Sequence, residues 1–329
     1  MNKDFKCDKN LLITNMKYFE KYLSDSKSID DIDISVHCDI NIFDWLMRYI
    51  HRKEPVIEIK NSVSILISSD FLQMAGLVEE ALIYVSKNLN EIIQLPIDMN
   101  CMNSALIKRL AQKVSLPDLN ELQDKKDKLT SKIYMKKLES LFEEEHNMLH
   151  RCVNCSTLYT SHQREWNSCP KANIFIDFNG NMVAKHQSDK HWDINKFVMF
   201  LRSKNVSWQE IFWKMFARLQ EFRCTLCDQK FIGAEINHCN SHPMNPKYTY
   251  QSQEGVHPCC NSKAYRFKSA LKHNGCTAMN HKIKTGSPRK TVKSRAQNFE
   301  LLMEHFKMVC EPYTYEVEDP LTGITEKKV

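Results

Sequence analysis

The sequence lacks any apolar run long enough to span a membrane, and its first ten residues, MNKDFKCDKN, contain no apolar core of the kind that a secretory signal needs. We therefore expect a soluble protein that is not secreted. It also lacks the Gly-x-Ser-x-Gly, P-loop and dinucleotide-binding patterns that mark common enzyme classes. No internal repeat and no Gly- or Pro-rich linker is recognisable. These absences favour a non-enzymatic intracellular protein.

The composition is that of a globular chain. Its 329 residues are 42% hydrophobic and 10% aromatic, which excludes wholesale disorder and allows two or three compact domains. The formal net charge of +6 is modest. It permits non-specific contact with nucleic acid but does not predict it, because a committed binder usually concentrates its charge on one surface. We expect protein partners, no membrane and no small-molecule substrate.

The first half is predicted to alternate amphipathic helices with short strands. Residues 10–23 repeat apolar side chains at helical spacing, and residues 32–36 alternate apolar and polar side chains as a half-buried strand does. Asn41 is expected to cap the next helix, and residues 56–59 to form a brief extended piece. The clearest helix is expected to begin at Asp70, with its apolar side chains on one stripe.

This order resembles the BTB/POZ family on the segments FKCDKNLLITNMKYFEKYL, IDISVHCDINIFDWLMRYI and SDFLQMAGLVEEALIYV. The resemblance implies an α+β fold in which residues 1–115 form a BTB/POZ-like α/β domain with a helical extension. The strand hairpin that normally precedes the position of Phe5 in this family is missing, so we expect a truncated domain. The family's usual function is homodimerisation, and many of its members are substrate adaptors for cullin ubiquitin ligases.

A charged, helical linker is expected over residues 116–150, after which the sequence changes character. Residues 174–183 predict a hairpin around Asn179-Gly180, and residues 195–201 predict a helix. Ser207 begins a capping box for a further helix. That helix carries an aromatic stripe that we expect to be core, made of Trp208, Phe212, Trp213 and Phe216. We expect residues 151–221 to form a zinc-ribbon-like hairpin with aromatic-rich helices.

Cysteine is concentrated in the second half. Of the thirteen cysteines, nine fall between Cys152 and Cys276, mixed with histidines. In a chain without a secretory signal, this clustering indicates metal binding rather than disulfides. Three cysteines of the first half are instead expected to be core fillers, namely Cys7, Cys38 and Cys101.

Eight candidate ligands after residue 222 form four pairs, the number that two closed tetrahedral zinc sites need. The pairs are Cys224 with Cys227, Cys239 with His242, Cys259 with Cys260, and Cys276 with His281. A Cys-x2-Cys turn lets both thiolates reach one ion, so the first pair is predicted to share a metal. Adjacent cysteines in an extended chain point to opposite sides, which predicts different ions for Cys259 and Cys260.

Two further metal arrangements remain open. A single Cys2His2 finger would use Cys224, Cys227, His238 and His242, but its middle spacing is short and four downstream ligands would go unused. His238 and His257 are kept only as substitute ligands. A third zinc site is predicted upstream, with His186 or His162 completing a set of three thiols from Cys152, Cys155 and Cys169.

The segments CNSHPMNPKYTY, HPCCNSKAYRF and GCTAMNH resemble the CHORD family of cysteine- and histidine-rich domains. The resemblance implies that residues 222–281 form a structural, non-catalytic two-zinc domain that binds partner proteins. The ligands it carries over are Cys239, His242, Cys259, Cys260, Cys276 and His281. Cys224 and Cys227 are more closely spaced than the corresponding pair usually is in that family.

The order of the whole chain resembles a family of BTB-containing nuclear regulators of class switch recombination. This resemblance implies a nuclear scaffold that self-associates through its BTB-like region and engages corepressor-type proteins, with a cytoplasmic location as the alternative. The other functions left open are a cullin ubiquitin-ligase adaptor and a zinc-finger DNA-binding protein. Residues 282–329 are expected to be a basic, partly flexible tail that contacts nucleic acid only non-specifically.

Overall fold

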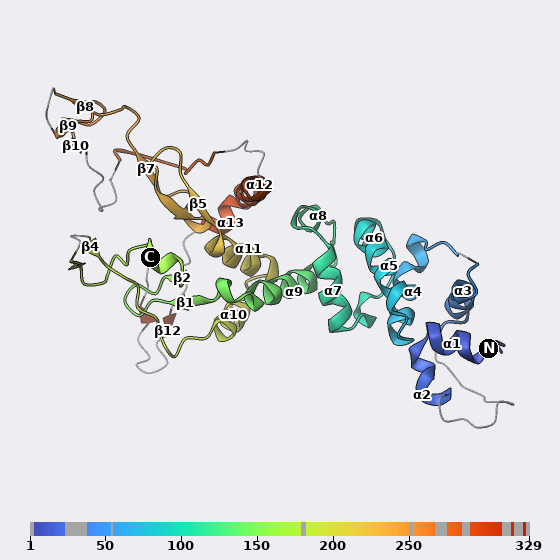
Figure 1. Ribbon diagram of the computed structural model, residues 1–329. Coiled ribbons are helices and arrows are strands. Elements are labelled where there is room, and N and C mark those ends of the chain that lie inside the picture. The colour runs from blue at the N-terminus through green and yellow to red at the C-terminus, as the bar shows by residue number, and fades with distance from the viewer. Residues whose placement is uncertain are drawn as a thin grey trace. The chain divides into compact units, whose positions relative to one another are not determined.

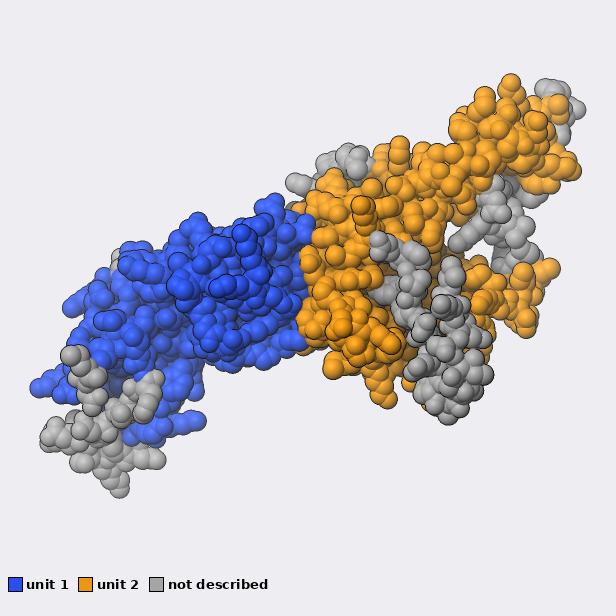
Figure 2. All heavy atoms as spheres, turned by 180° about the vertical axis from the view of Figure 1, so that it is seen from behind, with its two compact units in different colours: residues 1–137 blue, residues 138–329 orange. Residues whose placement is uncertain are grey.

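The computed structural model describes residues 3–23, 38–53, 55–178, 182–249, 253–266, 275–284, 290–310, 317–318 and 325–326 (Figure 1). Helices and strands are mixed, as predicted. The chain divides into two compact units, Met1–Lys137 and Leu138–Val329, which Figure 2 colours separately. Helix α9 (Thr130–Glu143) contains the division between them.

The described part of the first unit is helical, with no strand among residues 3–23, 38–53 and 55–137. Short 3-10 turns, η1 (Lys17–Phe19) and η2 (Met99–Cys101), interrupt the helices. The helices are α1 (Lys9–Asn15), α2 (Glu20–Leu23), α3 (Ile40–Ile50), α4 (Ile59–Phe71), α5 (Ala75–Lys87), α6 (Leu89–Gln94), α7 (Ser104–Lys113) and α8 (Leu116–Asn120). The strand predicted at residues 32–36 lies outside the described residues.

Helices α4 and α5 pack against each other, and side chains from both are fully buried. The prediction that one helix begins at Asp70 is wrong, because α4 continues to Phe71 and α5 begins at Ala75. Gln73 has a left-handed φ of 58°, and the next N–H, that of Met74, donates to Ser69 O at 2.9 Å. This hydrogen-bonding pattern is a Schellman motif, which ends a helix.

The cap of α3 also differs from the prediction. Asp39, and not Asn41, is the N-cap, and its Oδ1 accepts from the N–H groups of Asn41 and Ile42 at 2.9 and 3.1 Å. The extended piece predicted at residues 56–59 is not a strand: residues 55–58 belong to neither a helix nor a strand, and Ile59 already belongs to α4.

The second unit contains short antiparallel strand pairs and four helices beyond the end of α9 among its described residues. The pairs are β1 (Leu149–Arg151) with β2 (Leu158–Thr160), β3 (Phe175–Ile176) with β4 (Met182–Val183), β5 (Glu221–Arg223) with β6 (Lys230–Ile232), β7 (Cys239–Ser241) with β11 (Thr277–Met279), and β12 (Val317–Glu318) with β13 (Thr325–Glu326). Strands β8 (Lys247–Tyr248), β9 (Glu254–Val256) and β10 (Lys263–Tyr265) form a three-stranded sheet. The helices are α10 (Ile194–Ser203), α11 (Trp208–Leu219), α12 (Lys290–Glu304) and α13 (Phe306–Cys310). Three 3-10 turns complete the unit: η3 (Glu145–Asn147), η4 (Gln163–Glu165) and η5 (Gly233–Glu235).

Helix α11 is the centre of the second unit and contacts β2, η5 and α13. Its predicted cap is confirmed, because Ser207 Oγ accepts from the N–H of Glu210 at 3.1 Å. The aromatic stripe is also largely core as predicted: Phe212, Trp213 and Phe216 are buried, and Trp208 is half-buried.

The predicted hairpin around Asn179-Gly180 is confirmed by the pairing of Phe175 with Val183 and of Ile176 with Met182. Its turn lies outside the described residues. Several apolar side chains of this hairpin face solvent, and Phe178 is 97% exposed.

The basic segment after His281 is more ordered than the sequence predicts. Helix α12 begins at Lys290, and its C-terminal part buries Leu301 and Leu302. Phe299 of the same helix packs edge-on against Phe222 of β5, with ring centroids 5.2 Å apart. Leu301, Leu302 and Val309 of the expected tail therefore belong to the core of the unit.

Candidate metal centres

Twelve cysteine and histidine side chains of the second unit gather in three groups of four among the described residues. Within each group, the ligand atoms all lie within 4.8 Å of one another. The first cluster is Cys152, Cys155, Cys169 and His186; the second is Cys224, Cys227, Cys239 and His281; the third is His242, Cys259, Cys260 and Cys276. These are the twelve side chains that the sequence predicts as ligands, and each cluster offers three thiols and one imidazole.

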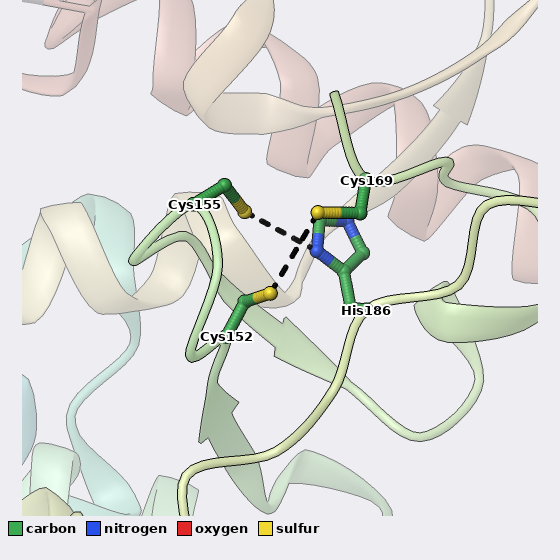
Figure 3. Close-up of side chains that lie close together, drawn as sticks. All are labelled: Cys152, Cys155, Cys169 and His186. Atoms are coloured by element: carbon green, nitrogen blue, oxygen red, sulfur yellow. Dashed lines mark hydrogen bonds between the residues drawn. The ribbon is translucent and has the colours of Figure 1, made fainter. Parts of the chain in front are cut away.

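The first cluster lies at the turn between β1 and β2 (Figure 3). Cys152 Sγ is 3.8 Å from Cys169 Sγ, and Cys155 Sγ is 3.4 Å from His186 Nδ1. His186 is buried, whereas His162 is exposed and its Nδ1 lies 2.9 Å from a carboxylate oxygen of Glu221. The structure thus selects His186 from the two histidines that the sequence left open.

The thiols of the first cluster differ in acidity. Burial acts to raise the pKa of Cys152, but hydrogen bonds from the backbone at Cys155 and from the His186 ring outweigh it and lower that pKa to about 6. Burial raises the pKa of Cys169 to about 11, and the neighbouring cysteines add to the rise. The surroundings of Cys152 therefore favour its thiolate, whereas those of Cys169 favour its protonated thiol, and a bound cation would displace the proton of Cys169.

The second cluster lies at the turn between β5 and β6, which carries Cys224 and Cys227. Cys224 Sγ is 3.8 Å from Cys239 Sγ, and Cys227 Sγ is 3.6 Å from His281 Nδ1. Cys224 and Cys227 thus share one cluster, as predicted. Burial, together with the charges of the two other thiols, raises the pKa of Cys239 to about 12.

The third cluster is built around His242 and is more exposed than the other two. The Sγ atoms of Cys259 and Cys260 each lie 3.4 Å from His242 Nδ1, and Cys276 Sγ lies 3.5 Å from Cys259 Sγ. The prediction of different ions for Cys259 and Cys260 is wrong. It assumed an extended chain, whereas both residues lie in a tight turn that continues into Asn261, whose φ is 56°.

The pairing of β7 with β11 joins the second and third clusters. At one end of this two-stranded ladder Cys239 pairs with Met279, and at the other Ser241 pairs with Thr277. Cys239 and the nearby His281 therefore enter the second cluster, while His242 and Cys276 enter the third. Each of these two sequence pairs is divided between clusters.

Gly275 allows the close approach at the third-cluster end of the ladder. A Cβ atom at this position would lie 2.2 Å from the backbone nitrogen of Ser241. Only glycine therefore fits beside Cys276 without displacing β7.

The donor sets fit zinc. Four donors of the Cys3His type are the composition of closed structural zinc sites. A tetrahedron with Zn–S bonds of about 2.3 Å has S···S edges of roughly 3.8 Å and S···N edges of roughly 3.6 Å. The S···S distances of 3.8 Å in the first two clusters and the S···N distances of 3.4 to 3.6 Å in all three match these edges. None of the thirteen cysteines forms a disulfide.

The Cys2His2 finger is ruled out as an arrangement of these residues. His238 is exposed and belongs to none of the three clusters, and His242 belongs to a different cluster from Cys224 and Cys227. His257, the other substitute ligand, also lies outside the clusters, although its ring stacks on that of His242 with centroids 3.6 Å apart.

The structure contains a repeat that sequence reading missed. Three six-residue turns, each between paired strands, share one backbone geometry; they are residues 152–157, 224–229 and 257–262, which we call the knuckles. In each knuckle the first N–H donates to the sixth carbonyl oxygen at 2.9 Å, and the fifth residue has a φ between 54° and 60°. The shared sequence signal is only a cysteine at the fourth position followed by Ser, Asp or Asn, which is too short to stand out.

Comparison with known families finds a match in the N-terminal region. The family model that matches residues 1–82 is described as "SANT and BTB domain regulator of CSR, BTB domain". The chain thus combines an N-terminal BTB-like helical domain with a Cys/His-rich C-terminal region. No solved structure matches the chain. No helix in the described part of the chain is both long and apolar enough to cross a membrane.

Proposed function

We propose that this protein is a non-enzymatic nuclear regulatory scaffold whose BTB-like unit binds protein partners and whose second unit is held folded by three zinc ions. The observation that carries the proposal is the gathering of twelve predicted ligands into three four-donor clusters, in a chain whose first 82 residues match a BTB family model.

The zinc ions are proposed to be structural. Catalytic zinc needs an open coordination position, whereas each cluster supplies all four donors from the protein. By analogy with zinc-finger peptides, each ion contributes roughly 10–16 kcal/mol to folding. The strands offer little with which to replace that contribution, because each strand in the described part of the second unit is two or three residues long.

The BTB-like unit is proposed to bring together two copies of the chain, or one copy and a corepressor-type protein. BTB domains generally act through protein–protein contacts, and the matching family is named for a regulator of CSR, which we read as class switch recombination. We also propose that residues 222–281 form a CHORD-like domain that binds partner proteins. Regulation then follows from proximity and needs no chemistry.

Zinc content tests the first part of the proposal. Elemental analysis of the full chain should find three zinc ions, and the double variant Cys259→Ser, Cys260→Ser should hold two, because both residues belong to the third cluster. Chelation should abolish the folded near-UV signal of the second unit. A metal-free chain that stays folded under chelator would remove the basis of the proposal.

Light scattering and affinity capture test the second part. We expect a mass of twice 38.7 kDa at micromolar concentration. Capture of a cullin through the first unit would instead favour a ubiquitin-ligase adaptor. A monomer that captures no corepressor-type protein would contradict the scaffold function while leaving the zinc sites intact.

A further inference from the structure

The histidine of each cluster lies flat against another ring. His186 stacks on Tyr159 with centroids 4.9 Å apart and an interplanar angle of 23°, and His281 stacks on Phe231 at 4.0 Å and 14°. Tyr159 and Phe231 occupy the same place in their hairpins, the middle of the second strand. Both are buried. The knuckle hairpin thus provides two ligands and also the surface on which a third ligand rests.

The third knuckle lacks that aromatic ring. The middle residue of its second strand is Ala264, which offers no ring to stack on. His242 stacks instead on His257, with centroids 3.6 Å apart and planes within 12° of parallel. His257 is the first residue of its knuckle, the position that Cys152 and Cys224 occupy in the other two.

His257 has two conceivable roles, as a metal donor or as the ring that supports His242. Its place in the knuckle favours a donor, but the geometry favours the supporting ring. Cys259, Cys260, Cys276 and His242 already supply four donors, and His257 is not among the atoms that converge. The lone pairs of an imidazole lie in its ring plane, so two rings stacked face to face do not direct them at one ion.

We propose that His257 is a positioning residue for the third metal centre, holding the His242 ring so that Nδ1 faces the Sγ atoms of Cys259 and Cys260. In the third cluster Cys259 takes the place of the cysteine that stands first in the other two knuckles, Cys152 and Cys224. The inference rests on the proposed zinc function. The third metal then needs an aromatic ring at position 257 and does not need a ring nitrogen there.

The restraint matters more here than at the other two sites. Cys260 and Cys276 are exposed, whereas Cys152, Cys169 and His186 of the first cluster are buried. Aromatic stacking of this kind is worth a factor of roughly two to ten in an equilibrium constant. Removing the ring should therefore weaken the third metal by that factor without removing it.

The test uses the full chain with His257→Phe and His257→Ala, and with Val256→Ala as a control at an exposed position of β9, directly before His257. Zinc is counted by elemental analysis, and its affinity is measured by competition with a chromophoric chelator. Cobalt substitution then reports the donor set through the thiolate-to-cobalt absorption. We expect His257→Phe and Val256→Ala to match the wild type. We expect His257→Ala to bind three metals in the absence of chelator and to keep the cobalt spectrum. Its third metal should be removed at a chelator concentration roughly two- to tenfold lower than in the wild type.

Several outcomes would overturn the inference. Loss of the third metal or a changed cobalt spectrum in His257→Phe would make His257 a ligand, and an unaltered affinity in His257→Ala would leave it without a role. A third metal that survives Cys259→Ser would likewise make His257 a ligand. A wild-type chain with fewer than three metals would instead count against the proposed zinc function itself, so the two failures are distinguishable.

Discussion

Cys239 and His242 are separated by two residues and belong to different clusters, the second and the third. Cys239 is the first residue of β7 and His242 directly follows its last residue, and the pairing of β7 with β11 places Cys239 near His281 and His242 near Cys276. A single two-stranded ladder therefore places one pair of candidate ligands in each of two clusters. In the folded chain, the four side chains of each cluster therefore converge only with this strand pairing in place.

This arrangement predicts that the second and third centres are coupled and that the first is independent. Cys239→Ser should lose the second metal and weaken the third, because β7 is no longer anchored at one end. Cys155→Ser should lose only the first metal, leaving the chelator competition of the other two unchanged. Zinc stoichiometry during stepwise chelation measures both variants. Equal affinity of the third metal in the Cys239→Ser variant and the wild type would contradict the coupling.

Gly275→Ala is expected to damage the second and third centres together. The new Cβ would meet the backbone of Ser241 at 2.2–2.3 Å and push β7 and β11 apart. Gly76→Ala is the matched control, since no atom lies within 4 Å of its new Cβ and the residue is in helix α5, where alanine is favoured by up to about 1 kcal/mol. We expect zinc content and melting temperature to fall only in Gly275→Ala. If both variants retained three metals and the wild-type melting temperature, the close approach would have no structural consequence.

Asp124 is predicted to stabilise the start of α9. Its Oδ2 accepts from the N–H groups of Leu129 and Thr130 at 2.9 and 3.0 Å, and its Oδ1 from that of Lys128 at 3.0 Å. Burial acts to raise the pKa of Asp124, but these backbone hydrogen bonds outweigh it and hold the pKa below its ordinary value of 3.8. Asp124→Asn should cost roughly 1 kcal/mol of unfolding free energy at pH 7.

The pH dependence of this effect follows from the direction of the shift. A carboxyl with a lowered folded-state pKa contributes its stability above the ordinary value and loses it as the pH falls through the folded value. The difference between wild type and Asp124→Asn, measured by urea unfolding of the first unit, should therefore shrink below pH 3.8. Glu121→Gln, at an exposed position nearby, is the control. A difference that persists unchanged into acid would assign the effect to something other than the charge.

The cost of replacing an aromatic residue of the second unit by alanine should depend on how deeply its ring is buried. Phe231→Ala removes a ring that is 2% exposed and should cost about 3–5 kcal/mol, together with the second metal. Phe178→Ala removes one that is 97% exposed and should change the unfolding free energy by no more than about 0.5 kcal/mol. Denaturant midpoints measure both. A large loss in Phe178→Ala would mean that the hairpin side chain packs in solution.

Local features of the chain were predictable where the signal was itself local. The Ser207 cap and the β3–β4 hairpin were found because a single turn residue or an Asn-Gly pair specifies them. The start of α5 was missed because apolar periodicity runs on through Gln73, where only a backbone angle ends the helix. The order in residues 290–304 was missed because its basic composition hides a few buried side chains near the end of the helix.

The sequence by itself determined which side chains can bind metal. Spacing and residue type, with no folded structure in view, identify eleven of the twelve side chains in the clusters and narrow the twelfth to His186 or His162. Tertiary structure alone decided how they are divided, because membership depends on the pairing of β7 with β11, two strands more than thirty residues apart in the chain. Tertiary structure also decided between His186 and His162, and it stacked the ring of His257 on that of His242. The physical reason is that a donor's chemistry belongs to its residue, whereas four donors converge on one point only when distant segments pair.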